Sequence, residues 1–104
     1  MTAIPGAAAA VTGAASGIGQ ALAIELAARG CNLALADRDE AGLAATAAEI
    51  GRKVEVSVHR VDIGVPADIA TFAQTAIAAH PALNILVNNA GVALLGVRLA
   101  LAER

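Results

Sequence analysis

A glycine-rich turn is the part of this sequence best suited to chemistry. Gly13, Gly17 and Gly19 stand between a short apolar run and a helical pattern. Unpaired N–H groups at a helix start and the positive end of the helix dipole attract phosphate, and glycines let a ligand approach the main chain. The alternative interpretation is a tight turn that packs a strand against a helix. A Walker P-loop is excluded, because Gln20 stands where that motif requires Lys followed by Ser or Thr.

An acidic residue follows the second apolar run. Asp37 lies 18 positions beyond Gly19, where an aspartate can accept both hydroxyls of an adenosine ribose and would repel a 2′-phosphate. The adjacent Arg38 could accommodate that phosphate, so these residues favour NAD over NADP without excluding NADP. The alternative interpretation of Asp37 is an ordinary solvated aspartate in a strand–helix loop.

Two alternating periods define the elements that must position these residues. Strands are predicted at 7–12, 32–36, 54–58 and 83–87, and helices at 18–29, 39–50 and 66–79. Alternating strands and helices with short connections are typical of a parallel sheet covered by helices on both faces. Right-handed crossovers then give the strand order 3-2-1-4 of a partial Rossmann fold, the doubly wound α/β class.

Composition excludes several classes of function. The 104 residues are 58% hydrophobic and 15% charged, which suits one small domain with a buried core. The net charge is −2 and the basic residues are scattered, so we expect no nucleic-acid binding. Glycine, proline and polar residues interrupt the uncharged stretches 1–24 and 69–97, so we expect no membrane segment. A single cysteine, Cys31, precludes an internal disulfide and a structural zinc site, and it fits a reducing cytoplasm.

Four motifs, in order along the chain, resemble those of the short-chain dehydrogenase/reductase family of the classical type. They are Gly13-x-x-x-Gly17-x-Gly19, Asp37 after the second strand, Val61-Asp62-Ile63 after the third, and Asn88-Asn89-Ala90-Gly91 after the fourth. The resemblance runs from about Ala8 to Gly96.

The resemblance implies a dinucleotide site to which all four motifs contribute. Its implied residues are Gly13, Ser16, Gly17, Ile18 and Gly19 at the pyrophosphate, Asp37 at the adenosine ribose, Asp62 and Ile63 at the adenine edge, and Asn89, Ala90 and Gly91 beside the central strand and the ribose. Two alternatives stay open: Asp62 as a helix-capping acid and Asn88 as a turn residue.

The family's catalytic groups have no counterpart in this sequence. The resemblance implies a Ser, a Tyr and a Lys four residues after the Tyr, all located beyond the Asn-Asn-Ala-Gly motif. The chain has no Tyr, and its only Lys is Lys53. We therefore expect a dinucleotide-binding half-domain at 1–96, a divergent tail at 97–104 and no catalytic residue. The tail is either a short helix or the product of a reading-frame change.

Three functions remain open on the sequence. The chain is the cofactor-binding part of a short-chain oxidoreductase, truncated before the catalytic residues and inactive alone, or a non-catalytic dinucleotide-binding module, or a remnant without function. An apolar strand at 83–87 would form an open sheet edge, which predicts self-association. His59 and His80 are interpreted as surface or hydrogen-bonded histidines and Cys31 as a small buried hydrophobe, so no metal site is expected.

Overall fold

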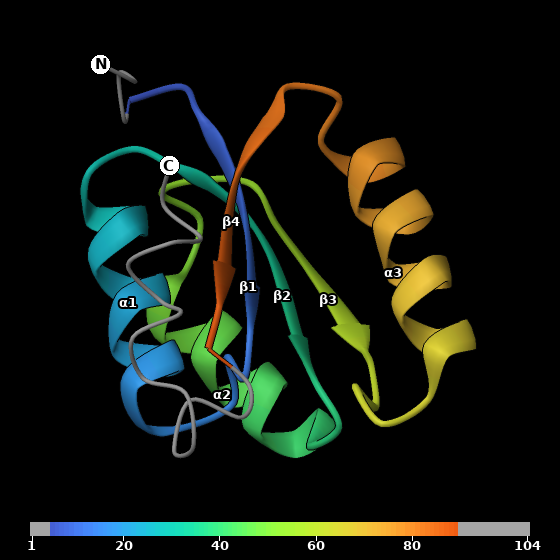
Figure 1. The fold of residues 1–104 in the computed structure, drawn as a ribbon. Helices are drawn as coiled ribbons and strands as arrows, with labels where there is room; N and C mark the ends of the chain where they lie inside the picture. Colours follow the sequence, from blue (N-terminus) through green and yellow to red (C-terminus); the bar gives the residue numbers. More distant parts are fainter. Residues whose placement is uncertain (1–4, 90–104) are drawn as a thin grey trace.

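The computed structural model of the chain describes residues 5–89 (Figure 1). The elements are β1 (Ala8–Thr12), α1 (Gly17–Ala28), β2 (Asn32–Asp37), α2 (Glu40–Ile50), β3 (Val56–Arg60), α3 (Pro66–Ala79) and β4 (Leu83–Asn88). Neighbouring strands pair in parallel in the order β3-β2-β1-β4. The strand order and the α/β class predicted from the sequence are confirmed.

Helices cover both faces of the sheet, with α1 and α2 on one face and α3 on the other (Figure 1). Because β1 lies between β2 and β4, all five of its residues are buried, and its side chains enter two different clusters. Val11 packs with Leu33 and Leu35 beneath α1 and α2. Ala10 packs on the opposite face with Phe72 of α3. A strand buried on both faces has no polar alternation, which explains its continuous apolar run.

The strand β3 begins two residues later than the sequence pattern predicts. Just before β3, the N–H of Glu55 donates to the side-chain Oδ1 of Asn32 at 2.9 Å, while the carbonyl of Glu55 accepts the main-chain N–H of Leu33 at 2.8 Å. Val56 packs against the cluster beneath α1 and α2, as its alternating position predicts. Val58 does not, and 51% of its surface is exposed at this edge of the sheet.

The polar face of β3 lies beneath α3 and is joined to it by hydrogen bonds. Ser57 Oγ lies 2.7 Å from His59 Nε2 and 2.9 Å from His80 Nε2. His59 Nδ1 lies 3.2 Å from Thr75 Oγ1, and its ring meets Phe72 edge-on with 5.2 Å between centroids. Both histidines are therefore hydrogen-bonded, as one of the two interpretations held. His80 is only 5% exposed, so a surface position for it is wrong.

The thiol of Cys31 is fully buried at the start of β2. Burial raises the pKa of Cys31, which keeps the thiol protonated and unreactive at neutral pH. The interpretation as a small buried hydrophobe is confirmed. Among residues 5–89, no group of three metal-ligating side chains comes together. No helix in this part of the chain has the length and apolar character needed to cross a membrane.

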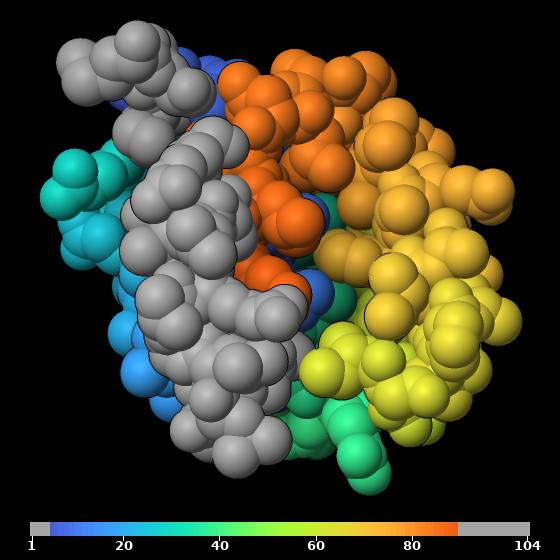
Figure 2. Space-filling model, in the orientation of Figure 1, coloured from blue at the N-terminus to red at the C-terminus, as the bar shows by residue number. Residues whose placement is uncertain are grey.

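At the other end of the sheet order, β4 is an edge strand of the described sheet. A hollow of about 440 Å³ lies between β4 and α3, with atoms of β1 at its floor (Figure 2). Leu86 of β4 is 49% exposed beside it, and Ile77 of α3 is 55% exposed. The apolar open edge expected at 83–87 is thus present among the described strands.

The environment of His59 predicts that acid weakens the fold. Burial first, and repulsion from His80 second, hold the pKa of His59 below its ordinary 6.5. The unfolded chain therefore binds the proton more readily, and stability falls as pH drops through and below about 6.5. We expect the urea midpoint to fall between about pH 7.5 and about pH 5, and to fall less in His59→Gln. An equal pH dependence in both proteins would contradict the role of His59.

Candidate functional site

A pocket of about 290 Å³ lies at the carboxyl ends of the parallel strands. It is lined by Thr12, Gly13, Ala36, Asp37, Arg38, Val61 and Ile63. Four of these residues belong to the predicted site: Gly13, Asp37, Arg38 and Ile63. The sequence reasoning did not include Thr12, Ala36 and Val61 in the site, although each lies at or just before or after the carboxyl end of a strand. Ligands of doubly wound folds bind at this edge of the sheet, where the strand order reverses.

The turn from β1 to α1 exposes main chain on its outer side. Gly13 and Gly17 adopt φ of 66° and 58°, a conformation that other residues rarely adopt. The Ser16 side chain makes no capping bond, and Ser16, Gly17 and Ile18 are exposed. A Cβ at Gly17 would meet no atom within 4 Å. The first N–H groups of α1 have no partner within the helix, so they can receive an anion here.

Gly19 serves a different purpose in the same turn. A Cβ there would lie 2.0 Å from the carbonyl oxygen of Gly13 and 2.6 Å from Asn89 Nδ2. The third glycine therefore allows α1 to pack directly against the ends of β1 and β4. The interpretation of the turn as close packing of a strand against a helix is thus confirmed at Gly19, and anion binding beside the open space at Gly17 stays a prediction.

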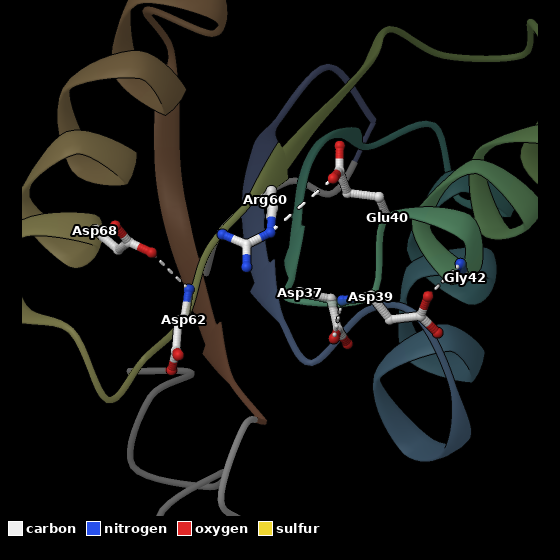
Figure 3. A network of polar contacts seen from close by, with 7 residues as sticks. All are labelled: Asp37, Asp39, Glu40, Gly42, Arg60, Asp62 and Asp68. Carbon is white, nitrogen blue, oxygen red and sulfur yellow. Dashed lines mark hydrogen bonds and ion pairs between the residues drawn. The ribbon is translucent and has the colours of Figure 1, made fainter.

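Asp37 is tied to the glycine turn. Its Oδ2 accepts the N–H of Ala15 at 3.0 Å. Its Oδ1 accepts the N–H of Asp39 at 3.1 Å, and Figure 3 shows this second bond. The turn is held further by Ala14, whose N–H donates to the carbonyl of Ala36 at 3.1 Å. Asp37 is thus half-buried and hydrogen-bonded to the turn, and its binding of a ribose stays a prediction. Each carboxylate oxygen keeps a lone pair that a ribose hydroxyl could use.

Asp62 stabilises the loop between β3 and α3. Its N–H donates to Asp68 Oδ2 at 2.9 Å, as Figure 3 shows. Its own Oδ1 accepts the N–H of Gly64 at 2.9 Å. Because the residue at the start of α3 is Val65, Asp62 is not a helix cap, and that alternative is wrong. Ile63 is 44% exposed and lines the pocket. Residues 62 and 63 thus lie beside the pocket, as the predicted adenine contact requires.

The end of β4 is joined to the end of β1 through Thr12. Its hydroxyl donates to Asn88 Oδ1 at 3.1 Å and accepts the N–H of Asn89 at 3.0 Å. Asn89 Nδ2 also donates to the carbonyl of Gly13 at 3.3 Å. Asn88 is therefore the last residue of a strand and a partner of β1, and its interpretation as a turn residue is wrong. The remaining predicted site residues, Ala90 and Gly91, lie outside the described residues, as does the predicted tail at 97–104.

Two arginines near the pocket differ in whether they form an ion pair. Arg38 is exposed at the rim and forms no ion pair within residues 5–89. Arg60 lies 4.0 Å from Glu40, both of them exposed (Figure 3). Asp37 and Arg38 thus offer the pocket one carboxylate and one unpaired guanidinium, side by side in sequence.

Comparison with known proteins identifies relatives along nearly the whole chain. The sequence model of the family described as short chain dehydrogenase matches residues 7–103. A protein of Streptomyces violaceoruber, named as ketoacyl reductase 1 of the granaticin polyketide synthase, is 44% identical over 95 residues. That match covers 86% of this chain and 35% of the relative. The chain thus spans about a third of the length of this relative.

Solved structures agree with the sequence relatives. A short chain dehydrogenase/reductase from Burkholderia phymatum, in complex with NAD, matches with a TM-score of 0.78 and 36% identity, over 83% of this chain and 31% of that protein. An alcohol dehydrogenase from the archaeon Thermococcus sibiricus, complexed with 5-hydroxy-NADP, matches with a TM-score of 0.73 and 30% identity, over 77% and 35%. Similar proteins therefore bind either form of the cofactor.

Proposed function

Because the chain belongs to the short chain dehydrogenase family, we propose that it is the cofactor-binding part of an oxidoreductase. The reaction is hydride transfer between a nicotinamide cofactor and an alcohol or carbonyl. The observation that carries the proposal is the glycine turn: exposed main chain at Gly17 and Ile18 lies at the start of α1, and Asp37 is hydrogen-bonded to the same turn. The start of a helix can bind a pyrophosphate, and a carboxylate at the end of the second strand can bind the ribose of the same dinucleotide.

The residues of the pocket fit a dinucleotide. Gly17 leaves the space that a pyrophosphate needs beside the main chain. Asp37 would accept the ribose hydroxyls, and Ile63 would lie against the adenine. Asp62 has one carboxylate oxygen, Oδ2, without a hydrogen-bond partner among residues 5–89, and this oxygen could accept from the adenine amine. When bound, the nicotinamide supplies or takes up the hydride; these residues hold the cofactor in place.

We propose NAD as the preferred cofactor. A carboxylate at the ribose attracts two hydroxyls and repels a 2′-phosphate. Arg38, exposed at the rim, would reduce that repulsion without removing Asp37 from the site. We therefore place NADP second, and the site would bind it more weakly.

Substitution of Asp37 tests the cofactor site. We expect Asp37→Ala to weaken NAD binding roughly 10- to 150-fold, because a charge-assisted hydrogen bond contributes about 1.5–3 kcal/mol. NADP binding should weaken less or improve, since the repulsion of the 2′-phosphate is removed with the carboxylate. Titration calorimetry with both cofactors measures the two dissociation constants.

The control for this experiment is Glu40→Ala. It removes the same charge from an exposed residue at the start of α2, outside the pocket, and should leave both constants unchanged. NAD binding by Asp37→Ala as tight as that of the unmodified chain would remove Asp37 from the site. A loss of NAD and NADP binding in equal measure would mean that Asp37 acts only by holding Ala15.

We further propose that the 104-residue chain by itself does not catalyse hydride transfer. Transfer to a carbonyl requires a proton donor at the carbonyl oxygen, which is typically worth 10²–10⁴-fold in rate. The chain has no Tyr, and Lys53 precedes β3, at the end of the sheet opposite the pocket. We expect no change in nicotinamide absorbance with ketones or secondary alcohols. Turnover that persists through repurification and disappears in Gly17→Trp would show that another residue completes the site.

The exposed edge of β4 supports a further proposal, that copies of the 104-residue chain associate through it. Unpaired edge strands with apolar side chains recruit other strands, and Leu86 is 49% exposed there. We expect light scattering to show a mass that rises with concentration, and Leu86→Lys to reduce it. The matched control is Val58→Lys on the other edge strand, β3, where Val58 is 51% exposed. A clean monomer at all concentrations would contradict the proposal.

A further inference from the structure

A buried hydroxyl on α2 contacts the glycine turn from below. Thr46 is fully buried and belongs to none of the four sequence motifs. Its Oγ1 lies 2.9 Å from the carbonyl oxygen of Ala14 and accepts a hydrogen bond from Gln20 Nε2 at 3.0 Å. The carbonyl of Gly42, one helical turn earlier, lies 3.1 Å away and shares the same hydroxyl proton. One side chain thus joins α2, the turn and α1.

The helix α2 also packs against the turn without spare room. A Cβ on Gly42 would lie 2.7 Å from Ala15 Cβ and 3.0 Å from the Ala15 carbonyl oxygen. Ala14 is 0% exposed and Ala15 is 6% exposed. This half of the turn therefore rests on α2, whereas the half that begins at Ser16 is exposed.

We propose that Thr46 is a positioning residue for the pyrophosphate of the dinucleotide. The inference rests on the proposed function, since it concerns the same turn. Hydrogen-bond donors bind an anion best when they are fixed in place beforehand, because no reorganisation is then required on binding. Thr46 fixes Ala14 and, through Gln20, the first turn of α1. The exposed N–H groups that follow are thereby held in one arrangement, although Thr46 itself is buried beneath them.

The test compares two ligands that differ only in the pyrophosphate. Thr46→Val keeps the shape of the side chain and removes the hydroxyl, which leaves the Ala14 carbonyl without this partner. We expect the affinity for ADP to fall roughly 3- to 10-fold, the effect of one lost hydrogen bond. The affinity for adenosine, which has no pyrophosphate, should not change. Ligand-observed NMR titration of the full 104-residue chain measures both constants.

Two variants distinguish positioning from a general loss of structure. Thr46→Ser keeps the hydroxyl and should restore ADP affinity. Thr71→Val, which removes the hydroxyl of an exposed threonine on α3, should affect neither ligand. Should Thr46→Val fail to fold in a thermal melt, Gln20→Met removes only the donor to Thr46 and should weaken ADP in the same direction.

The outcomes separate this inference from the proposed function. Two results would overturn the positioning role and leave the proposed function standing. One is an equal loss of affinity for ADP and adenosine, and the other is an unchanged ADP affinity in Thr46→Val. If Thr46→Val does not fold, the same two results are sought in Gln20→Met. If the unmodified chain binds neither ADP nor NAD, the proposed function fails, and the inference fails with it.

Discussion

The position of the glycine turn depends on a close approach between the start of α1 and the main chain of Gly13, for which a side chain at Gly19 would leave no room. A Cβ on Gly19 would lie 2.0 Å from the carbonyl oxygen of Gly13, the same oxygen that accepts from Asn89. This one contact ties the start of α1 to the ends of β1 and β4 together. The contact between Gly19 and Gly13 also fixes the start of α1 relative to the sheet. The exposed N–H groups at Gly17 and the following residue therefore keep one direction.

Small residues also let the rest of α1 lie close to the sheet. Ala23 and Ala27 are buried at 0% and 4% exposure and belong to the cluster that contains Ala9. Alanine on both surfaces lets the helix lie near the sheet, but each alanine removes little apolar area from water. The larger burial in this cluster comes from leucines, among them Leu33 and Leu43. Within residues 5–89 the buried hydrophobic residues are therefore largely small, with alanine the most frequent.

The fold and the turn could be predicted because their signals are local. Buried strands are apolar on both faces, helices follow a longer period, and the glycine spacing stands within seven residues. The contacts that could not be predicted join residues far apart: Thr46 to Ala14 across 32 positions and Thr12 to Asn88 across 76. The sequence pattern of a helix does not distinguish an exposed threonine from one whose hydroxyl donates to a carbonyl in another element. The bond that the N–H of Glu55 donates to Asn32 Oδ1, just before β3, also joins residues 23 positions apart and follows from no periodicity.

Within residues 5–89, the proposed cofactor pocket and the two histidines lie at different places on the sheet. The carboxyl ends of the strands carry Asp37 and Asp62, which suit a ribose and an adenine. The histidines lie elsewhere: His59 and His80 share Ser57 beneath α3, and the ring of His59 rests on Phe72. Moving either histidine to the pocket would break the bonds that hold α3 to β3. In this part of the chain both histidines therefore hold α3 against β3, and neither lines the proposed cofactor pocket.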